Sequence, residues 1–227
     1  GGSSAVSWGV FDHDLGLAGH LARQVAQITG RGIDVQVIAS PALGVDRALA
    51  ELDADVLART DAVVLTLGTR EAFEFMTVAR WRSGLTRVLD TIAEAPGHPA
   101  VIVVGAEEVS PVPLPRWFTR IAMSRAIELN AATRSLIADR PQTVFVASGL
   151  VSDTPGTEGL YDVDRSALYD HAARAITPAL SAALDGRPQR MESITDERGR
   201  LEATARARAT DQRQRDELDR LVAAVRD

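Results

Sequence analysis

The first ten residues contain the side chains best suited to covalent chemistry. Gly1 to Val10 form a stretch of small residues that leads directly into a segment with helical periodicity. Hydrolytic α/β enzymes expose a serine hydroxyl on such a turn, so Ser3 is the candidate nucleophile and Trp8 the aromatic side chain expected beside it. A serine hydroxyl needs a base that accepts its proton. An imidazole or a carboxylate elsewhere in the chain would have to fill this role.

The four histidines are scattered along the chain. His13 is the closest to Ser3 in sequence, His20 falls within the first helical pattern, and His98 within a Pro/Gly turn. None of the spacings matches a metal-binding pair such as His-x-x-x-His, so we predict no metal site. His171, in the last long helical pattern, is retained as a candidate base, with a surface or packing role as the alternative.

Two missing residue types exclude whole classes of chemistry. The sequence contains no cysteine, which excludes disulfides, thiolate zinc sites and cysteine nucleophiles. It also contains no lysine, since all 25 basic residues are arginine, which excludes P-loop, Schiff-base and serine–lysine chemistry. No Gly-x-Gly-x-x-Gly stretch follows a strand-like segment, so we expect no dinucleotide and no other cofactor.

Charge and hydropathy narrow the set of partners. A net charge of −6 argues against a nucleic-acid surface. No apolar run reaches the roughly 18 to 20 residues that cross a bilayer, and no secretory signal is visible. We therefore expect a cytoplasmic location and no membrane span.

Helical and strand-like patterns alternate along most of the chain. This order predicts an α/β fold: a doubly wound, flavodoxin-like parallel sheet with helices on both faces. Such sheets bind ligands at the carboxyl ends of their strands. Helices are expected at about 15–29, 45–59, 71–94, 116–138 and 165–184, and strands at 33–39, 62–67, 100–105 and 143–147.

The two ends of the chain suggest further elements. A turn that feeds a helix at Gly1 implies a preceding strand, so we expect either residues upstream or a sheet that is one strand short. Residues 186–227 are rich in both arginine and acids and predict a charged helix or linker. Late apolar residues in this tail fall on one helical stripe, which suggests a helix-mediated partner or self-association. We accordingly expect an α/β domain over 1–185 and a tail over 186–227.

Several short blocks resemble the SGNH, or GDSL-like, hydrolase family. Gly1 to Val10 resembles the first block, with Ser3 at the nucleophile position and Gly2 in place of the usual aspartate. Gly44 lies where the family places an oxyanion-hole glycine. Gly68-Thr69-Arg70-Glu71 resembles the Gly-x-Asn-Asp block, with Arg70 in place of asparagine and Glu71 as the acid. The resemblance implies a three-layer α/β/α fold and carries Gly68, Arg70 and Glu71 over as binding residues.

The last block of the family has the pattern Asp-x-x-His, and the histidine is missing here. The matching stretch runs from Tyr161 to Tyr169, and the histidine position falls on Asp164 or Arg165. Asp162 or Asp164 could replace the imidazole if burial made the carboxylate more basic, and Arg165 is a binding candidate.

Two functional hypotheses follow from the resemblance. The first is a serine ester hydrolase or acyltransferase that acts on a small acyl ester and is impaired by these losses. The alternative is a degenerate SGNH-like domain that binds a ligand or partner and is coupled to a further domain through the C-terminal helix. A flavodoxin-like binding domain outside the family also remains open. Trp81, Trp117 and Phe118 are expected to pack between helices and sheet.

Overall fold

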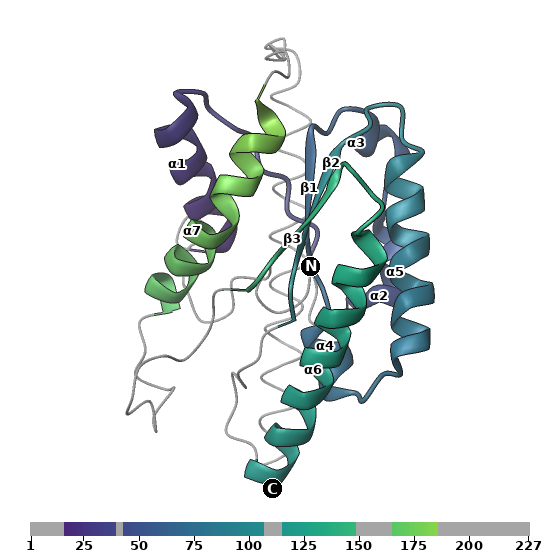
Figure 1. Cartoon of the computed structure of the whole chain (residues 1–227). Helices are drawn as coiled ribbons and strands as arrows, with labels where there is room; N and C mark the ends of the chain where they lie inside the picture. Colours follow the sequence, from purple (N-terminus) through teal and green to yellow (C-terminus); the bar gives the residue numbers. More distant parts are fainter. Residues whose placement is uncertain (1–15, 40–42, 107–114, 149–164, 186–227) are drawn as a thin grey trace, which may run out of the picture. The chain divides into compact units, whose positions relative to one another are not determined.

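The structure, a computed structural model, describes residues 16–39, 43–106, 115–148 and 165–185. Three parallel strands form its sheet in the order β1-β2-β3: β1 (Ala62–Thr66), β2 (Ala100–Val104) and β3 (Thr143–Val146) (Figure 1). Their bounds agree with three of the four strands that the sequence predicts. The expected tail at 186–227 lies outside the described residues.

Helices cover both faces of this sheet (Figure 1). Helices α5 (Val78–Ala93) and α6 (Arg116–Ile137) pack on one face, and α1 (Leu17–Thr29) and α7 (Arg165–Leu184) on the other. The side chains of β2 alternate between the two cores: Val101 and Val103 join α5 and α6, whereas Ile102 and Val104 join α1 and α7. Burial on both faces explains why β2 is an uninterrupted apolar run.

The helix expected over 45–59 is divided into three short pieces. These are α2 (Val45–Ala48), a 3₁₀ turn η2 (Leu49–Glu51) and α3 (Ala54–Ala58). The break occurs because the Asp53 carboxylate accepts hydrogen bonds from the backbone N–H groups of Asp55 and Val56, which starts a new helix.

The helix expected over 71–94 is also divided. Helix α4 (Thr69–Phe73) ends before Phe75, whose φ of 54° lies in the left-handed region and stops the helix. Helix α5 then begins after Thr77, whose hydroxyl accepts a hydrogen bond from the Arg80 N–H. The sequence pattern merged these two helices because both carry the same apolar periodicity.

The strand predicted at 33–39 is wrong. This segment is not part of the sheet, and Val35 and Val37 are 37% and 40% exposed. A strand needs a neighbouring strand to bond its backbone, and β1 pairs only with β2 among the described residues. The alternating apolar pattern of 33–39 is therefore not sufficient to make this segment a strand of the sheet.

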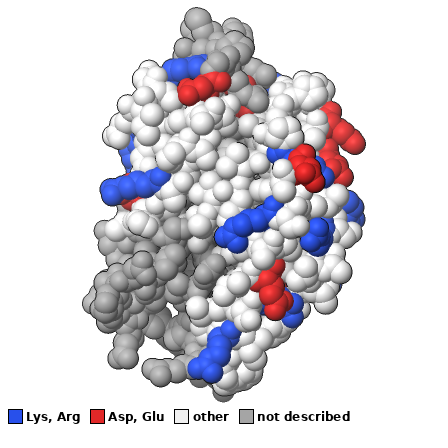
Figure 2. All heavy atoms as spheres, in the orientation of Figure 1, with Lys and Arg blue, Asp and Glu red and all other residues white. Residues whose placement is uncertain are grey.

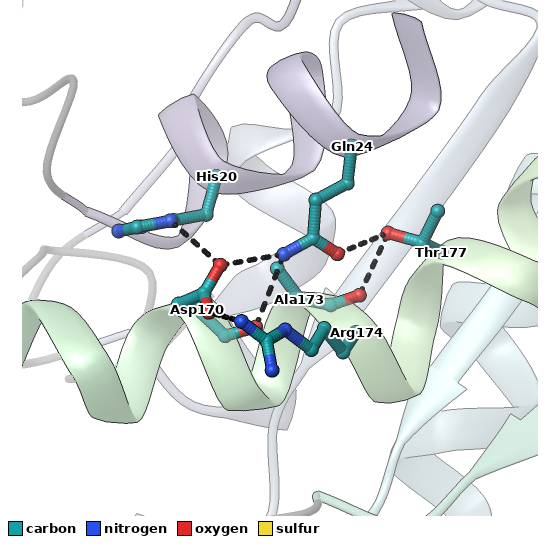
Figure 3. Close-up of polar contacts among 6 residues, drawn as sticks. All are labelled: His20, Gln24, Asp170, Ala173, Arg174 and Thr177. Atoms are coloured by element: carbon teal, nitrogen blue, oxygen red, sulfur yellow. Dashed lines mark hydrogen bonds and ion pairs between the residues drawn. The ribbon is translucent and has the colours of Figure 1, made fainter. Parts of the chain in front are cut away.

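A polar network joins α1 to α7 (Figure 3). Gln24 of α1 donates its side-chain amide to the Asp170 carboxylate at 2.8 Å and accepts a hydrogen bond from the Thr177 hydroxyl at 3.1 Å. Asp170 also pairs with Arg174 and lies 3.3 Å from His20 Nδ1. One carboxylate therefore links side chains from both helices.

This network makes the contact between α1 and α7 sensitive to acid. Partial burial raises the pKa of Asp170, but the Gln24 hydrogen bond and the charges of Arg174 and His20 together hold it below the ordinary value of 3.8. A lowered carboxyl pKa stabilises the fold above that value, and the contribution is lost as the pH falls through the folded-state pKa. We expect Asp170→Asn to lower Tm at neutral pH, and the difference from the wild type to shrink as the pH falls below 3.8. Thermal unfolding across this range tests it, and a constant difference would contradict it.

Candidate functional site

The buried carboxylate of Glu71 joins two loops at the carboxyl edge of the sheet. Its Oε1 accepts a hydrogen bond from the Val45 N–H at 2.5 Å, and its Oε2 accepts one from the Gly68 N–H at 2.9 Å. Glu71 is only 1% exposed. Val45 begins α2, whereas Gly68 follows β1 and precedes α4. One side chain therefore fixes the distance between segments that lie more than twenty residues apart in the sequence.

Gly44 lies directly against this carboxylate. A Cβ atom at position 44 would be 2.8 Å from Glu71 Oε1 and 3.7 Å from Arg70 Cδ. The absence of a side chain at position 44 lets the backbone approach Glu71 and Arg70 closely. Gly44, Gly68, Arg70 and Glu71 are thus brought together at one place.

Arg70 is the cationic group of this cluster. Its guanidinium forms an ion pair with Glu74 one helical turn further along α4, at 2.5 Å, and both side chains are partly exposed. A guanidinium carries several donors in a fixed fork, so it can bind Glu74 and an anionic ligand group together. Arg70 therefore offers positive charge at the solvent side of Gly44.

Buried polar contacts also support the neighbouring loops. Gly68 has a φ of 110°, and a Cβ there would lie 3.4 Å from the ring of Trp81. The Trp81 indole N–H donates to the Thr133 hydroxyl of α6 at 2.9 Å. At the loop that follows β2, the side chain of Asn130 from α6 accepts a hydrogen bond from the Ala106 N–H at 2.7 Å. The same side chain donates one to the Ala106 carbonyl at 3.1 Å. Helix α6 therefore fixes the chain where it leaves β2.

An aromatic cluster joins the end of α4 to the start of α6. The Phe118 ring centroid is 6.1 Å from that of Phe73, 5.3 Å from that of Phe75 and 5.7 Å from that of Trp117. Trp81 is 2% exposed and packs in the core as expected, whereas Trp117 is 65% exposed, which corrects the packing role predicted for it. Because Phe73 and Arg70 share α4, this apolar surface adjoins the cationic one.

The structure describes only some of the site residues that the sequence predicts. Ser3, Trp8, Asp162 and Asp164 lie outside the described residues, Arg165 is the first residue of α7, and His171 is exposed on that helix. The sequence reasoning missed Trp81, Thr133 and Asn130 as supports of the site. Buried polar residues within amphipathic helices were the available signal, but the pattern does not reveal their partners.

Charged side chains on the visible face are distributed rather than clustered. Figure 2 shows arginines and acids interspersed over the described surface, with broad uncharged areas between them. Across the described ranges, every helix is too short or too polar to cross a membrane.

Comparison with known proteins places this architecture beside one solved structure. The crystal structure of TesA superposes with a TM-score of 0.55 and 18% sequence identity, over 81% of this chain and 97% of that chain. The fold is shared. No family model matches the sequence, and no curated protein does. At this identity the likeness to TesA describes the arrangement of elements and not the chemistry.

The close approach at Gly44 predicts a specific sensitivity to substitution. Gly44→Ala should lower the free energy of unfolding by about 1 to 3 kcal/mol, because the added methyl meets the buried carboxylate. Gly32→Ala is the matched control, since a Cβ there meets nothing within 4 Å. Urea denaturation followed by circular dichroism measures both, and equal midpoints for the two variants would contradict the prediction.

Proposed function

We propose that this chain is an SGNH-like hydrolase domain with a doubly wound, three-layer α/β/α arrangement. The likeness to TesA supports the fold, and the blocks containing Ser3, Gly44 and Gly68 to Glu71 support the family. The observation that carries the proposal is the pair of hydrogen bonds that the Glu71 carboxylate accepts from the Val45 and Gly68 N–H groups. These bonds hold the proposed oxyanion glycine, Gly44, near Arg70 at the carboxyl edge of the sheet.

The proposed reaction is acyl transfer from a small acyl ester. Ser3 Oγ attacks the carbonyl carbon, its proton passes to a base, and the carbonyl oxygen takes up negative charge beside the Gly44 N–H and Arg70. The alcohol then leaves, and water or a second alcohol accepts the acyl group. Asp162, Asp164 and His171 are the candidate bases, with Trp8 and Arg165 as binding residues.

The exposed aromatic cluster around Phe118 gives the proposed substrate a place to bind. One member, Phe73, lies on the same short helix as Arg70, and its ring stacks on Phe118 of α6. An apolar surface beside a guanidinium suits a ligand with a hydrocarbon part and a polar carbonyl end. The acyl group of an ester has this form.

A degenerate binding domain is the second candidate. The observation that favours it is the ion pair between Arg70 and Glu74, which occupies part of the guanidinium that replaces the family's asparagine. The histidine position of the last block is also occupied by Asp164 or Arg165. In this alternative the residues around Gly44 and Arg70 bind a ligand or partner without turnover, and we propose that the segment 186–227 couples this domain to a further one.

A serine-directed fluorophosphonate probe distinguishes the two functions. We expect the wild type and Ser4→Ala to be labelled and Ser3→Ala to lose labelling. Hydrolysis of a short p-nitrophenyl ester should fall by about 10²-fold in Arg70→Ala, because one stabilising donor is removed. A wild type that is not labelled but has a native circular dichroism spectrum would reject the hydrolase and leave the binding domain.

A further inference from the structure

Helix α6 carries apolar side chains on both its inner and its outer face. The inner face belongs to the core that α6 shares with α5. Among the described residues nine large apolar side chains are exposed, and four of these lie on α6, each at least 37% exposed: Trp117, Ile121, Met123 and Ile127. The large apolar side chains of α5, by contrast, are all buried or half-buried. Contiguous exposed apolar surface of this kind marks an interaction site.

The exposed residues of α6 form one continuous strip along the helix. Successive residues of an α-helix are about 100° apart, so residues three and four positions apart lie on the same side. The residues within about 60° of Ser124 in this projection are here called the α6 strip. They are all exposed: Trp117, Arg120, Ile121, Ser124, Ile127, Glu128 and Ala131.

The order of residues in the α6 strip is symmetric about its centre. Ile121 and Ile127 lie three residues on either side of Ser124. Arg120 and Glu128 lie four residues on either side, and carry opposite charges. A two-fold interface places the same surface of two copies together, so that surface must be self-complementary. When two α6 helices pack antiparallel about Ser124, each isoleucine reaches the level of the other isoleucine, and each Arg120 that of Glu128 in the second copy.

The charges of the strip favour the antiparallel arrangement over the parallel one. Arg120 is exposed and forms no ion pair with any other residue of the described ranges. Glu128 pairs with Arg125 of its own helix at 2.5 Å, but its side chain is 50% exposed, and a carboxylate can accept from a second cation. A parallel pair would instead bring each charge against its own copy, which is repulsive.

The shape of the strip suits a weak dimer. Two helices that cross near −50° lay their rows of residues spaced by four against each other, and Arg120, Ser124 and Glu128 form such a row. The small side chain of Ser124 lets the two helices approach at the crossing point. The strip is about 21 Å long and about 10 Å wide, which is less than the roughly 800 Å² per partner of a standard interface. Association through it should therefore depend on protein concentration.

We propose that two copies of this chain associate through the α6 strip, antiparallel and with the two-fold axis at Ser124. Phe118 lies about 120° around the helix from Ser124. The aromatic surface around Phe118 therefore stays outside the interface. The dimer goes beyond the proposed hydrolase function and does not depend on it.

Sedimentation velocity of the full chain over a wide range of concentrations tests the association. We expect the wild type to exchange between monomer and dimer, and Ile121→Glu to raise the dissociation constant about 100-fold, because symmetry removes the apolar contact twice. Ile28→Glu is the matched control, since Ile28 is 65% exposed on α1, and should leave the equilibrium unchanged. A wild type that stays monomeric, which would assign the strip to a different partner, or a dimer that Ile121→Glu does not weaken would overturn the proposal.

Exchanging the charges tests the antiparallel register, and it keeps the proposal falsifiable if Ile121→Glu does not fold. Arg120→Glu and Glu128→Arg should each weaken self-association about tenfold, because each brings like charges together at two contacts. Mixing the two variants in equal amounts restores opposite charges at both contacts, so the mixed dimer should form as strongly as the wild type. A mixture that associates no better than the separate variants would show that Arg120 and Glu128 do not meet across the axis, and would overturn the proposal.

Discussion

Replacing Glu71 with alanine is expected to lower the free energy of unfolding by about 3 kcal/mol. The substitution leaves the N–H groups of Val45 and Gly68 buried without an acceptor, and each lost bond to a charged group costs about 1.5 to 3 kcal/mol, reduced by local relaxation. The loop that contains Gly44 should separate from the loop after β1. Urea denaturation measures the loss, and a parallel fall in ester hydrolysis would tie it to the proposed site.

Two companion variants separate this effect from a general loss of charge. Glu71→Gln keeps one acceptor oxygen and turns an amide N–H₂ towards the second donor, so it should lose about half as much stability. Glu74→Ala removes the partly exposed partner of Arg70 and should cost less than about 1 kcal/mol. Equal losses of unfolding free energy in Glu71→Ala and Glu74→Ala would show that the buried hydrogen bonds of Glu71 do not hold the two loops together.

Replacing Trp81 with alanine is expected to cost about 3 to 5 kcal/mol, the largest single loss that we predict. The indole fills the core between α5 and α6, and its N–H donates to the Thr133 hydroxyl. Its ring also packs against the position where Gly68 passes, so the cavity extends to the loop after β1. Denaturation midpoints in urea and thermal unfolding give independent measures.

Matched aromatic variants identify what Trp81 contributes. Trp81→Phe keeps most of the ring and removes the donor, and should cost about 1 to 2 kcal/mol. Trp117→Ala removes the same residue type from an exposed position and should cost less than about 1 kcal/mol. If the alanine variants of Trp81 and Trp117 were equally stable, the distinction between core and surface at these positions would be wrong.

The sequence predicted correctly the elements whose apolar pattern is compatible with only one kind of secondary structure. The apolar run at β2 is buried on both faces, and α7 begins and ends at the residues expected. Local interactions and backbone conformation divided the longer helices: the Asp53 carboxylate starts α3, and the positive φ of Phe75 ends α4. Such breaks depend on side-chain geometry, which apolar periodicity does not record.

The candidate site was predictable as a set of loops but not as a set of contacts. The blocks that resemble the SGNH family indicated Gly44 and Gly68 to Glu71 as loop residues of one site. That Glu71 holds two backbone donors depends on how α2 and α4 meet in space. The segment 33–39 failed for a related reason, since a strand's pairing is decided by its neighbours.

The clamp of Asn130 on Ala106 has a practical consequence for protein engineering. Both backbone groups of Ala106 are bonded to one side chain of α6. The position of the chain is therefore fixed at Ala106, and α6 begins at Arg116. Peptide segments inserted between Ala106 and Arg116 are expected to leave the register of β2 unchanged, because Asn130 holds the chain at Ala106.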